Sequence, residues 1–434
     1  MTAPDRIPSE PAGSERARDG ATRLDWRVWL AIAFLVILPM PPLVYNGYAL
    51  LLGCLGIIAM ARTFNIRFSS ASARQATVLF ACLWVPIAIS WFDAADSYRA
   101  GTSGALYIRF LPMALFLCLA LDRLSASVRL RQAVALVCTF YVVDAGWQGL
   151  TGHNIIGNPA VGPQLTGMFY PKLQLGVVLA VLTPVILAEI EARSKSHPAW
   201  WLAVVPLAVV VALTLHRNSW VVFALALFGF IALRVAERRW RIRGKTLAWV
   251  AGITLVFSVV AIQHLSFKVR LFDTVAAALV EHEQLEIQLG QRPDIWRAAF
   301  NMYQANWLNG VGVRGFRGVY PDYAVADDYW RGQDQPVSPA HPHQLVLEVA
   351  AETGTLGLLG YVLVIAIAIA SYFRAPSANR HHAGPWLLAA LLLLWPLNIN
   401  KAFYGFFIAT FFWWVLAVYV ATLHAQTGIR EPAD

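Results

Sequence analysis

Charged residues are scarce in this chain of 434 residues. They make up 14% of it, whereas 58% of the residues are hydrophobic, and a soluble globular domain carries nearer one quarter charge. The alternation of apolar and polar residues that marks a membrane β-barrel is also missing. Apolar runs of about 20 residues recur instead, and backbone groups in lipid must find partners within their own segment. The composition therefore predicts an all-α polytopic membrane protein and argues against a soluble α/β enzyme.

Other absences narrow the class of protein. The chain has four cysteines, and all fall in predicted spans: Cys54, Cys82, Cys118 and Cys138. They indicate neither a disulfide framework nor a metal knuckle. The spacing of His341 and His343 is wrong for a zinc helix of the HExxH type, so we predict no metal and no cofactor. No soluble basic face that would bind nucleic acid is found.

We predict about twelve membrane spans. They are Trp26–Leu43, Tyr48–Ala61, Ala76–Phe92, Leu106–Leu121, Arg131–Leu150, Leu173–Ile190, Trp200–Leu215, Ser219–Val235, Thr246–Leu265, Gln344–Phe373, Gly384–Ile399 and Tyr404–Leu423. Basic residues concentrate in alternate loops, and the loop from Arg234 to Lys245 holds six of them beside one acidic residue. The positive-inside rule then places both termini in the cytoplasm. The net charge of +9 is explained by this orientation and by contact with anionic membrane lipids.

The predicted organisation is one bundle with one outer subdomain. It runs as a disordered cytoplasmic tail (1–24), spans one to nine (25–265), a periplasmic loop subdomain (266–342), spans ten to twelve (343–424) and a cytoplasmic tail (425–434). A loop of this length is usually functional. Within it we expect a helix from Val269 to Leu289, a second helix that starts around Pro293 and ends near Asn309, and irregular loop from Arg314 to Pro339.

Histidine stands at the outer mouth of the tenth span. Pro342 breaks the helix, so His343 should lie at its amino end, with His341 close by. Neutral imidazole can take a proton from a hydroxyl group at neutral pH. Glu352 lies deeper in the span, where an ionisable group is a functional candidate or satisfies a polar group of the bundle.

Cations occur at several other span ends. Arg217 follows His216 in a very short turn, and its planar guanidinium matches phosphate oxygens, although snorkelling at the interface is the alternative. Arg292 precedes a helix start, where backbone N–H groups favour an anion, unless Asp294 or Glu286 pairs with it. Further candidates at span mouths or in the outer loop are Lys172, Arg109, Lys401 and Arg314.

Three stretches together carry a family resemblance. They are Leu215-His216-Arg217-Asn218-Ser219; Gly290-Gln291-Arg292-Pro293-Asp294-Ile295-Trp296 with Asn309-Gly310-Val311-Gly312; and His341-Pro342-His343-Gln344 with Glu352-Thr353-Gly354-Thr355-Leu356-Gly357. In this order, the stretches resemble the O-antigen ligase and polymerase superfamily of bacterial inner-membrane glycosyltransferases. A weaker match ends at Lys172, where Asn is more usual, and His216 stands where the family often has Ser.

The resemblance implies a GT-C-like fold and a periplasmic active site. It implies metal-independent transfer of a glycan from undecaprenyl diphosphate to a sugar hydroxyl of the lipid A core. His343 would be the general base, and the donor diphosphate would be bound by Arg217 and Arg292 with Lys172, Arg109 and Lys401. The supporting candidates are His341, Glu352, His216 and Arg314. A single displacement at the anomeric carbon would invert its configuration.

Other functions fit parts of the same sequence. An O-antigen polymerase or a protein O-oligosaccharyltransferase would share the fold and differ in the acceptor. A transporter or flippase would also fit twelve spans, but such proteins usually show related halves and ionisable residues at the membrane midplane. Here the ionisable residues gather at span ends, which favours the transferase.

Overall fold

The computed structural model describes residues 25–67, 70–237, 292–331, 338–398 and 401–427. Three expectations lie outside these residues: the tail 1–24, the ninth span Thr246–Leu265, and the helix from Val269 to Leu289. So does the end of the carboxy-terminal tail, 428–434.

Every named element of the described residues is helical. The helices are α2 (Trp26–Ile37), α3 (Pro42–Arg67), α4 (Ala71–Ile89), α5 (Ser97–Tyr107), α6 (Phe110–Ala120), α7 (Leu124–Thr151), η1 (Gly167–Phe169), α8 (Leu175–Ser194), η2 (Pro198–Ala203), α9 (Val204–Leu213), α10 (Arg217–Ala236), α14 (Arg292–Ala305), α15 (Phe316–Tyr323), α16 (Leu345–Arg374), α17 (Ser377–Leu393) and α18 (Phe406–Leu423). Among these residues β pairing is confined to isolated bridges. Eight helical segments are long and apolar enough to cross a membrane. The predicted all-α polytopic membrane fold is thus confirmed, while the number of spans stays a prediction.

The predicted span boundaries differ from the helices in places. The fourth span was expected to begin at Leu106, but the helical segment begins at Ser97. The carboxylate of Asp96 accepts a hydrogen bond from the Arg99 N–H at 2.9 Å and so starts the helix earlier. The segment then breaks between α5 and α6, at Ile108 and Arg109.

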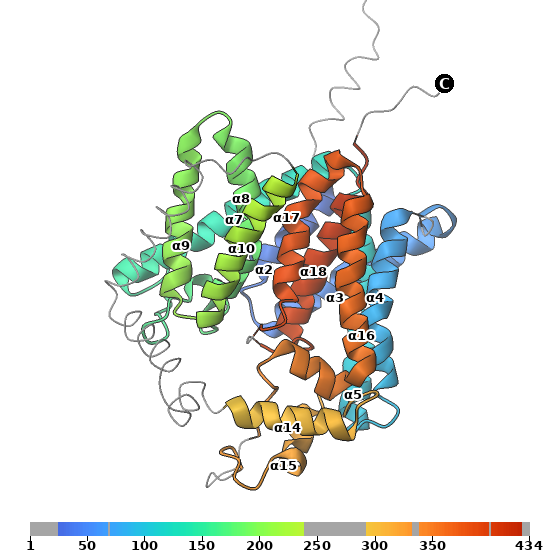
Figure 1. Ribbon diagram of the computed structural model, residues 1–434. Helices are drawn as coiled ribbons and strands as arrows, with labels where there is room; N and C mark the ends of the chain where they lie inside the picture. The colour runs from blue at the N-terminus through green and yellow to red at the C-terminus, as the bar shows by residue number, and fades with distance from the viewer. Residues whose placement is uncertain (1–24, 68–69, 238–291, 332–337, 399–400, 428–434) are drawn as a thin grey trace, which may run out of the picture.

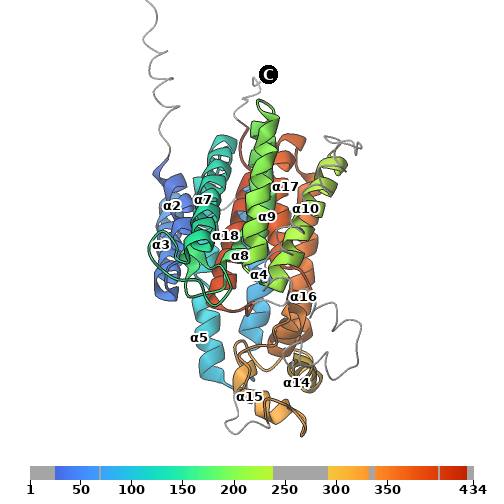
Figure 2. The same ribbon diagram turned by 90° about the vertical axis from the view of Figure 1, so that its left-hand side faces the viewer.

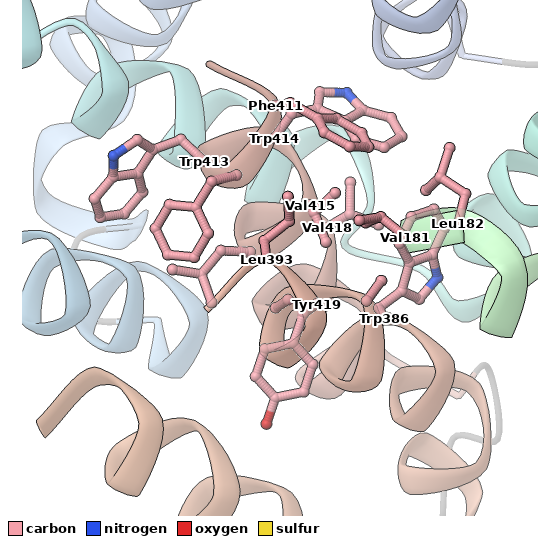
Figure 3. Packing of buried hydrophobic residues seen from close by; sticks show 14 of the residues in the cluster. Val181, Leu182, Trp386, Leu393, Phe411, Trp413, Trp414, Val415, Val418 and Tyr419 are labelled. Atoms are coloured by element: carbon pink, nitrogen blue, oxygen red, sulfur yellow. The ribbon is translucent and has the colours of Figure 1, made fainter. Parts of the chain in front are cut away.

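Two helices form the centre of the bundle. Of the apolar windows that identify the spans, 94% of the one in α18 and 89% of the one in α8 is buried, against about one third in α10 and α16. Aromatic side chains fill the space around α18 (Figure 3). The Trp414 ring stacks on Phe34 of α2, with ring centroids 5.2 Å apart, and its Nε1 donates to the Ala31 carbonyl at 3.2 Å. The peripheral helices expose large apolar side chains, as lipid contact requires.

A small outer subdomain caps one end of the bundle. In Figure 1, α14 and α15 lie below the spans, at the end opposite the carboxy terminus, and Figure 2 shows the same arrangement from the side. The subdomain core joins Ile295, Met302, Phe316 and Tyr320 to Ala351 of α16. The helix α15 (Phe316–Tyr323) corrects the expected irregular loop, because Phe316 and Tyr320 lie one turn apart and bury the same face.

Ion pairs fasten the helices at the other end of the bundle. Arg234, near the end of α10, is 1% exposed. Its Nε lies 2.8 Å from a Glu191 carboxylate oxygen, and its Nη1 lies 2.9 Å from one of Glu237. The same Nη1 is 3.0 Å from His381 Nδ1 of α17. Arg234, one of the basic residues expected to orient the chain, therefore also forms a buried network between α8, α10 and α17.

Candidate functional site

The segment that carries both histidines is held from three directions. Gln344 caps α16, since its side chain accepts a hydrogen bond from the Leu347 N–H. The Gln344 side chain also donates to the Pro396 carbonyl at 3.1 Å. Trp296 of α14 donates from Nε1 to the Pro342 carbonyl at 3.1 Å. The outer subdomain, α16 and the loop before α18 therefore meet at this segment.

His341 and His343 form a pair. Their ring centroids are 3.9 Å apart and the rings are nearly perpendicular, at 87°. His341 is 8% exposed. Burial, and then the charges of His343, Arg314 and Lys401, lower the pKa of His341 to about 3. His341 is thus neutral at physiological pH and lies in a positively charged surrounding, whereas His343 is only partly buried.

Three non-glycine residues of the described chain have positive φ, and all three belong to the predicted site segments. They are Leu215 (52°), Arg314 (63°) and His343 (54°). Left-handed backbone is unfavourable for such side chains and is found mostly where surrounding structure imposes it, often at functional sites. Each of these residues lies at or beside a candidate side chain, which fixes the direction in which that side chain leaves the backbone.

Arg217 is the first residue of α10. Only Thr214, Leu215 and His216 separate it from the end of α9, so the expected short turn is present. The His216 Nδ1 lies 3.2 Å from the Ser219 hydroxyl in the first turn of α10. Beside Arg217, the Asn218 side chain donates to Asn398 Oδ1 at 2.9 Å and so joins this helix end to the loop before α18.

Arg292 is the first residue of α14. Burial, and then the nearby charge of Arg217, lower the pKa of Arg292. Asp294, its expected alternative partner, instead accepts the Tyr329 N–H at 3.0 Å and lies 3.7 Å from Arg297. Two arginines at two helix amino termini thus lie within electrostatic range of each other, and such an arrangement favours a bound anion.

The two lysines also lie near one another. Lys172 precedes α8 by three residues and so lies just before the start of this helix. Its Nζ is buried without a hydrogen-bond partner among the described residues and lies 5.7 Å from the Tyr45 ring centroid. Desolvation, and then the charge of Lys172, lower the pKa of Lys401. Arg109 donates to Asn46 at 3.0 Å, next to Tyr45 on α3.

Sequence inspection missed the residues that shape the loop before Lys172. Gln148 of α7 accepts from the N–H groups of Thr166 and Gly167 at 2.9 and 2.8 Å. Asn154 donates to the Gly167 carbonyl at 2.9 Å. Asp144 is fully buried on α7, and the Ile155 N–H donates to it at 2.9 Å. The available signal was two polar side chains, Asp144 and Gln148, one turn apart within an apolar span.

The glycine-containing stretches 309–312 and 352–357 pack against each other. Val311 and Gly312 donate from their N–H groups to the Ala351 and Glu352 carbonyls, at 2.9 and 3.1 Å. Gly354 has φ 63° and ψ −158°, which interrupts α16. A Cβ atom at Gly354 would lie 2.4 Å from backbone atoms of Leu308 and Asn309. The glycines of both stretches therefore allow the backbone of α16 to lie directly against the backbone of the loop after α14.

The predicted residues gather at one end of the bundle through this set of contacts. Arg217 lies within electrostatic range of Arg292, and α14 donates a hydrogen bond to the histidine segment. The charges of Arg314 and Lys401 act on His341. The charge of Lys172 acts on Lys401. Arg109 and Lys172 contact neighbouring residues of α3, Asn46 and Tyr45 respectively. Glu352 faces the outer loop rather than the histidines, since it accepts the Arg314 N–H at 2.8 Å. Within the described residues no group of three or more His, Cys, Asp or Glu residues could hold a metal ion.

The arrangement defines a multi-pass membrane protein with a cationic, histidine-containing site at one end. Residues 202–362 match the protein family described as O-antigen ligase. The matched segment contains Arg217, Arg292, Arg314, His343 and Glu352. This match supports an O-antigen ligase/polymerase family protein, as the sequence motifs predicted, and with it a ligase- or polymerase-type activity. No curated protein matches the chain significantly.

Proposed function

We propose that this protein is an O-antigen ligase of the bacterial inner membrane. It transfers a glycan from undecaprenyl diphosphate to a sugar hydroxyl of the lipid A core, on the periplasmic face. Both termini lie in the cytoplasm in this proposal. The proposal covers the roles of His343 as base and of Arg217 and Arg292 as ligands of the donor diphosphate.

One observation carries the proposal. Arg217 and Arg292 begin two different helices and lie within electrostatic range of each other. The second of these helices donates a hydrogen bond to the residue between the two histidines. A cationic pair beside a basic imidazole is what diphosphate departure coupled to hydroxyl deprotonation requires.

The proposed chemistry is a single displacement. An imidazole nitrogen of His343 takes the proton of the acceptor hydroxyl, and the acceptor oxygen bonds to the anomeric carbon. The bond from that carbon to the phosphate oxygen breaks on the opposite face, and undecaprenyl diphosphate leaves with the electron pair. Arg217 and Arg292 stabilise the growing charge of the leaving group, and Lys172, Lys401 and Arg109 add to the positive field. Neutral His341 supports His343, and the anomeric configuration inverts.

Transfer by purified variants in lipid nanodiscs tests the assignment of the base. His343→Asn should lower the rate by about 10²–10⁴-fold, the usual contribution of a general base. Asn tolerates the left-handed backbone found at this position, so the loss reports chemistry rather than misfolding. His343→Ala, Arg217→Ala and Arg292→Ala should also abolish transfer, whereas Arg317→Ala should retain it. Full transfer by His343→Asn would refute the base.

The acceptor is tested in cells. A deletion strain should show bare lipid A core on a lipopolysaccharide gel and accumulate lipid-linked polymer. Loss of chain length alone would indicate a polymerase, and unglycosylated protein with normal lipopolysaccharide would indicate a protein glycosyltransferase. Transfer should persist in EDTA, because the arginines supply the charge that a metal ion provides elsewhere.

A further inference from the structure

A buried carboxylate fixes the backbone of Arg314. The Arg314 N–H donates to Glu352 Oε2 at 2.8 Å, and Glu352 is 2% exposed. Arg314 has a φ of 63°, a conformation that costs free energy in a non-glycine residue. The hydrogen bond to Glu352 satisfies the Arg314 N–H in this turn, and so it offsets part of that cost. The backbone of Arg314 is thereby held in one conformation.

The side chain of Arg314 extends over the loop before α18. Its Cζ lies 5.9 Å from the ring centroid of Phe406. Its Nη1 is 3.4 Å from the place that a Cβ atom on Gly405 would occupy. The guanidinium therefore rests on an aromatic and glycine surface, which restricts its position without occupying its hydrogen-bond donors.

A second buried carboxylate holds that surface in place. Glu348 accepts the N–H groups of Phe403 and Tyr404 at 2.9 and 3.1 Å, and it too is 2% exposed. Glu348 lies one turn before Glu352 on the same face of α16. One carboxylate thus holds the backbone of Arg314, and the other holds the loop on which its guanidinium rests.

The guanidinium is open to a ligand. Arg314 is exposed, and within the described part of the chain its side chain forms no ion pair at salt-bridge distance. It lies within electrostatic range of His341. A planar guanidinium with free donors beside a histidine pair suits the oxygens of a phosphoryl group, which it can contact at two points.

We propose that Arg314 binds a phosphoryl group of a substrate beside His341 and His343, and that Glu348 and Glu352 are positioning residues that hold it there. This inference rests on the proposed transferase function. The phosphoryl group belongs either to the diphosphate of the donor or to a phosphate carried by the acceptor glycolipid.

Steady-state kinetics of the purified full chain in nanodiscs tests the ligand role. The substrates are a polyprenyl diphosphate-linked glycan and an acceptor glycolipid prepared with and without phosphate. Arg314→Gln should raise the KM of one substrate by roughly 10- to 100-fold, as loss of a charge-assisted hydrogen bond predicts. Arg314→Lys should fall between Gln and wild type, because it keeps the charge and loses the fork. Arg317→Gln, an exposed arginine of the same subdomain, is the matched control and should stay near wild type.

The source of the phosphoryl group follows from which KM changes. A higher donor KM assigns Arg314 to the diphosphate. A higher acceptor KM that disappears with the dephosphorylated acceptor assigns it to the acceptor phosphate. If Arg314→Gln behaves like Arg317→Gln while the wild type transfers glycan, this inference fails and the transferase function stands. If the wild type transfers no glycan, the proposed function itself fails.

A double-mutant cycle tests the positioning role. Glu352→Gln keeps an oxygen that can accept the Arg314 N–H and should retain most activity, whereas Glu352→Leu should reproduce the KM effect of Arg314→Gln. The double variant Glu352→Leu with Arg314→Gln should be no worse than either single variant, because both remove one interaction. Additive losses, or a change in folded yield with normal KM, would show that Glu352 has only a structural role. Glu348→Gln and Glu348→Leu provide the same comparison for the second carboxylate.

Discussion

Leu215, Arg314 and His343 share a backbone conformation that their side chains disfavour. Each stands where the chain turns sharply at the mouth of the bundle, and each is held by surrounding contacts. Glu352 holds the backbone of Arg314. The residues on either side of His343 are held by the hydrogen bond from Trp296 to the Pro342 carbonyl and by the one from Gln344 to the Pro396 carbonyl. At the residue scale, the site thus depends on strained positions that supply fixed side-chain directions.

Gly354 shows how little freedom this mouth allows. Gly354→Ala would place a Cβ atom 2.4 Å from the backbone of Leu308 and Asn309, at a φ of 63°. Because backbone atoms cannot move aside as a flexible side chain can, we expect a destabilisation of at least about 1–3 kcal/mol together with loss of transfer. Thermal unfolding in detergent measures the first effect, and a nanodisc transfer assay the second.

Gly318 of α15 is the matched control for that substitution. It is exposed, and a Cβ atom there meets nothing within 4 Å. Gly318→Ala should leave the melting temperature unchanged or raise it slightly, because alanine favours helix by roughly 0.5–1 kcal/mol. Equal melting temperatures for the two variants would contradict the close approach of α16 to the loop after α14.

At the scale of helices, the two ends of the bundle treat charge in opposite ways. At the site end, Arg217 lies within electrostatic range of Arg292, and Lys172 lies within electrostatic range of Lys401. At the other end, arginines pair with glutamates, and Glu237 also accepts from Tyr372 at 2.8 Å. Although burial alone would raise the pKa of Glu237, hydrogen bonds from His381 and Tyr372 and the charges of Arg234 and His381 lower it to about 2.

Arg234→Met tests the network at the far end. It would remove the buried partner of Glu191 and Glu237, which are themselves half-buried, and breaking such a pair commonly costs up to about 3–5 kcal/mol. The melting temperature should fall strongly, while the folded fraction should keep its transfer rate because the site lies at the other end of α10. Arg99→Met is the control, since its pair with Asp96 is about half exposed and worth at most about 1 kcal/mol. A normal melting temperature for Arg234→Met would show that the network adds nothing to stability.

The network also predicts a dependence on pH. The pKa of Glu237 falls from an ordinary 4.5 to about 2 in the folded chain. Its contribution to stability is therefore complete above pH 4.5 and is lost as the pH falls toward 2, where the folded state also takes up the proton.

The whole molecule separates an outer end from a terminal end. The subdomain of α14 and α15 lies opposite the carboxy terminus (Figure 1). Leu124, the first residue of α7, donates from its N–H to the Gln426 carbonyl at 3.0 Å, so the start of α7 is joined to the carboxy-terminal segment. Arg123, one of the basic residues expected to face the cytoplasm, lies beside Gln426 at this terminal end.

Cysteine labelling checks the proposed orientation of the molecule. In a background with the four native cysteines replaced by alanine, Arg317→Cys in α15 should react with a membrane-impermeant thiol reagent in intact spheroplasts. Ser196→Cys, in the exposed turn between α8 and η2, should react only after the membrane is opened. Labelling of both, or the reverse pattern, would overturn the assignment of the outer subdomain to the periplasm.

The class of fold and most of the candidate residues could be read from the amino-acid sequence. In lipid, the backbone of a long apolar run satisfies its hydrogen bonds within the segment by forming a helix, and the basic loops predict an orientation. The motifs around Arg217, Arg292 and His343 stand at predicted helix starts, where a short turn or a proline indicates their place along the chain. These features involve residues that are close in the sequence, so the pattern of residues along the chain is enough to find them.

Which of these residues lie near one another, and which contacts hold them, depends on the packing of the helices. Arg217 lies within electrostatic range of Arg292, and Glu352 accepts the Arg314 N–H, although the residues of each pair are tens of positions apart in the sequence. Whether such pairs form depends on how the helices pack. The same holds for α15, whose buried face required a partner on α14 and α16. Packing also decided the partners of Glu348 and Glu352, which accept backbone N–H groups of neighbouring loops, because buried polar groups must be satisfied wherever the fold brings them.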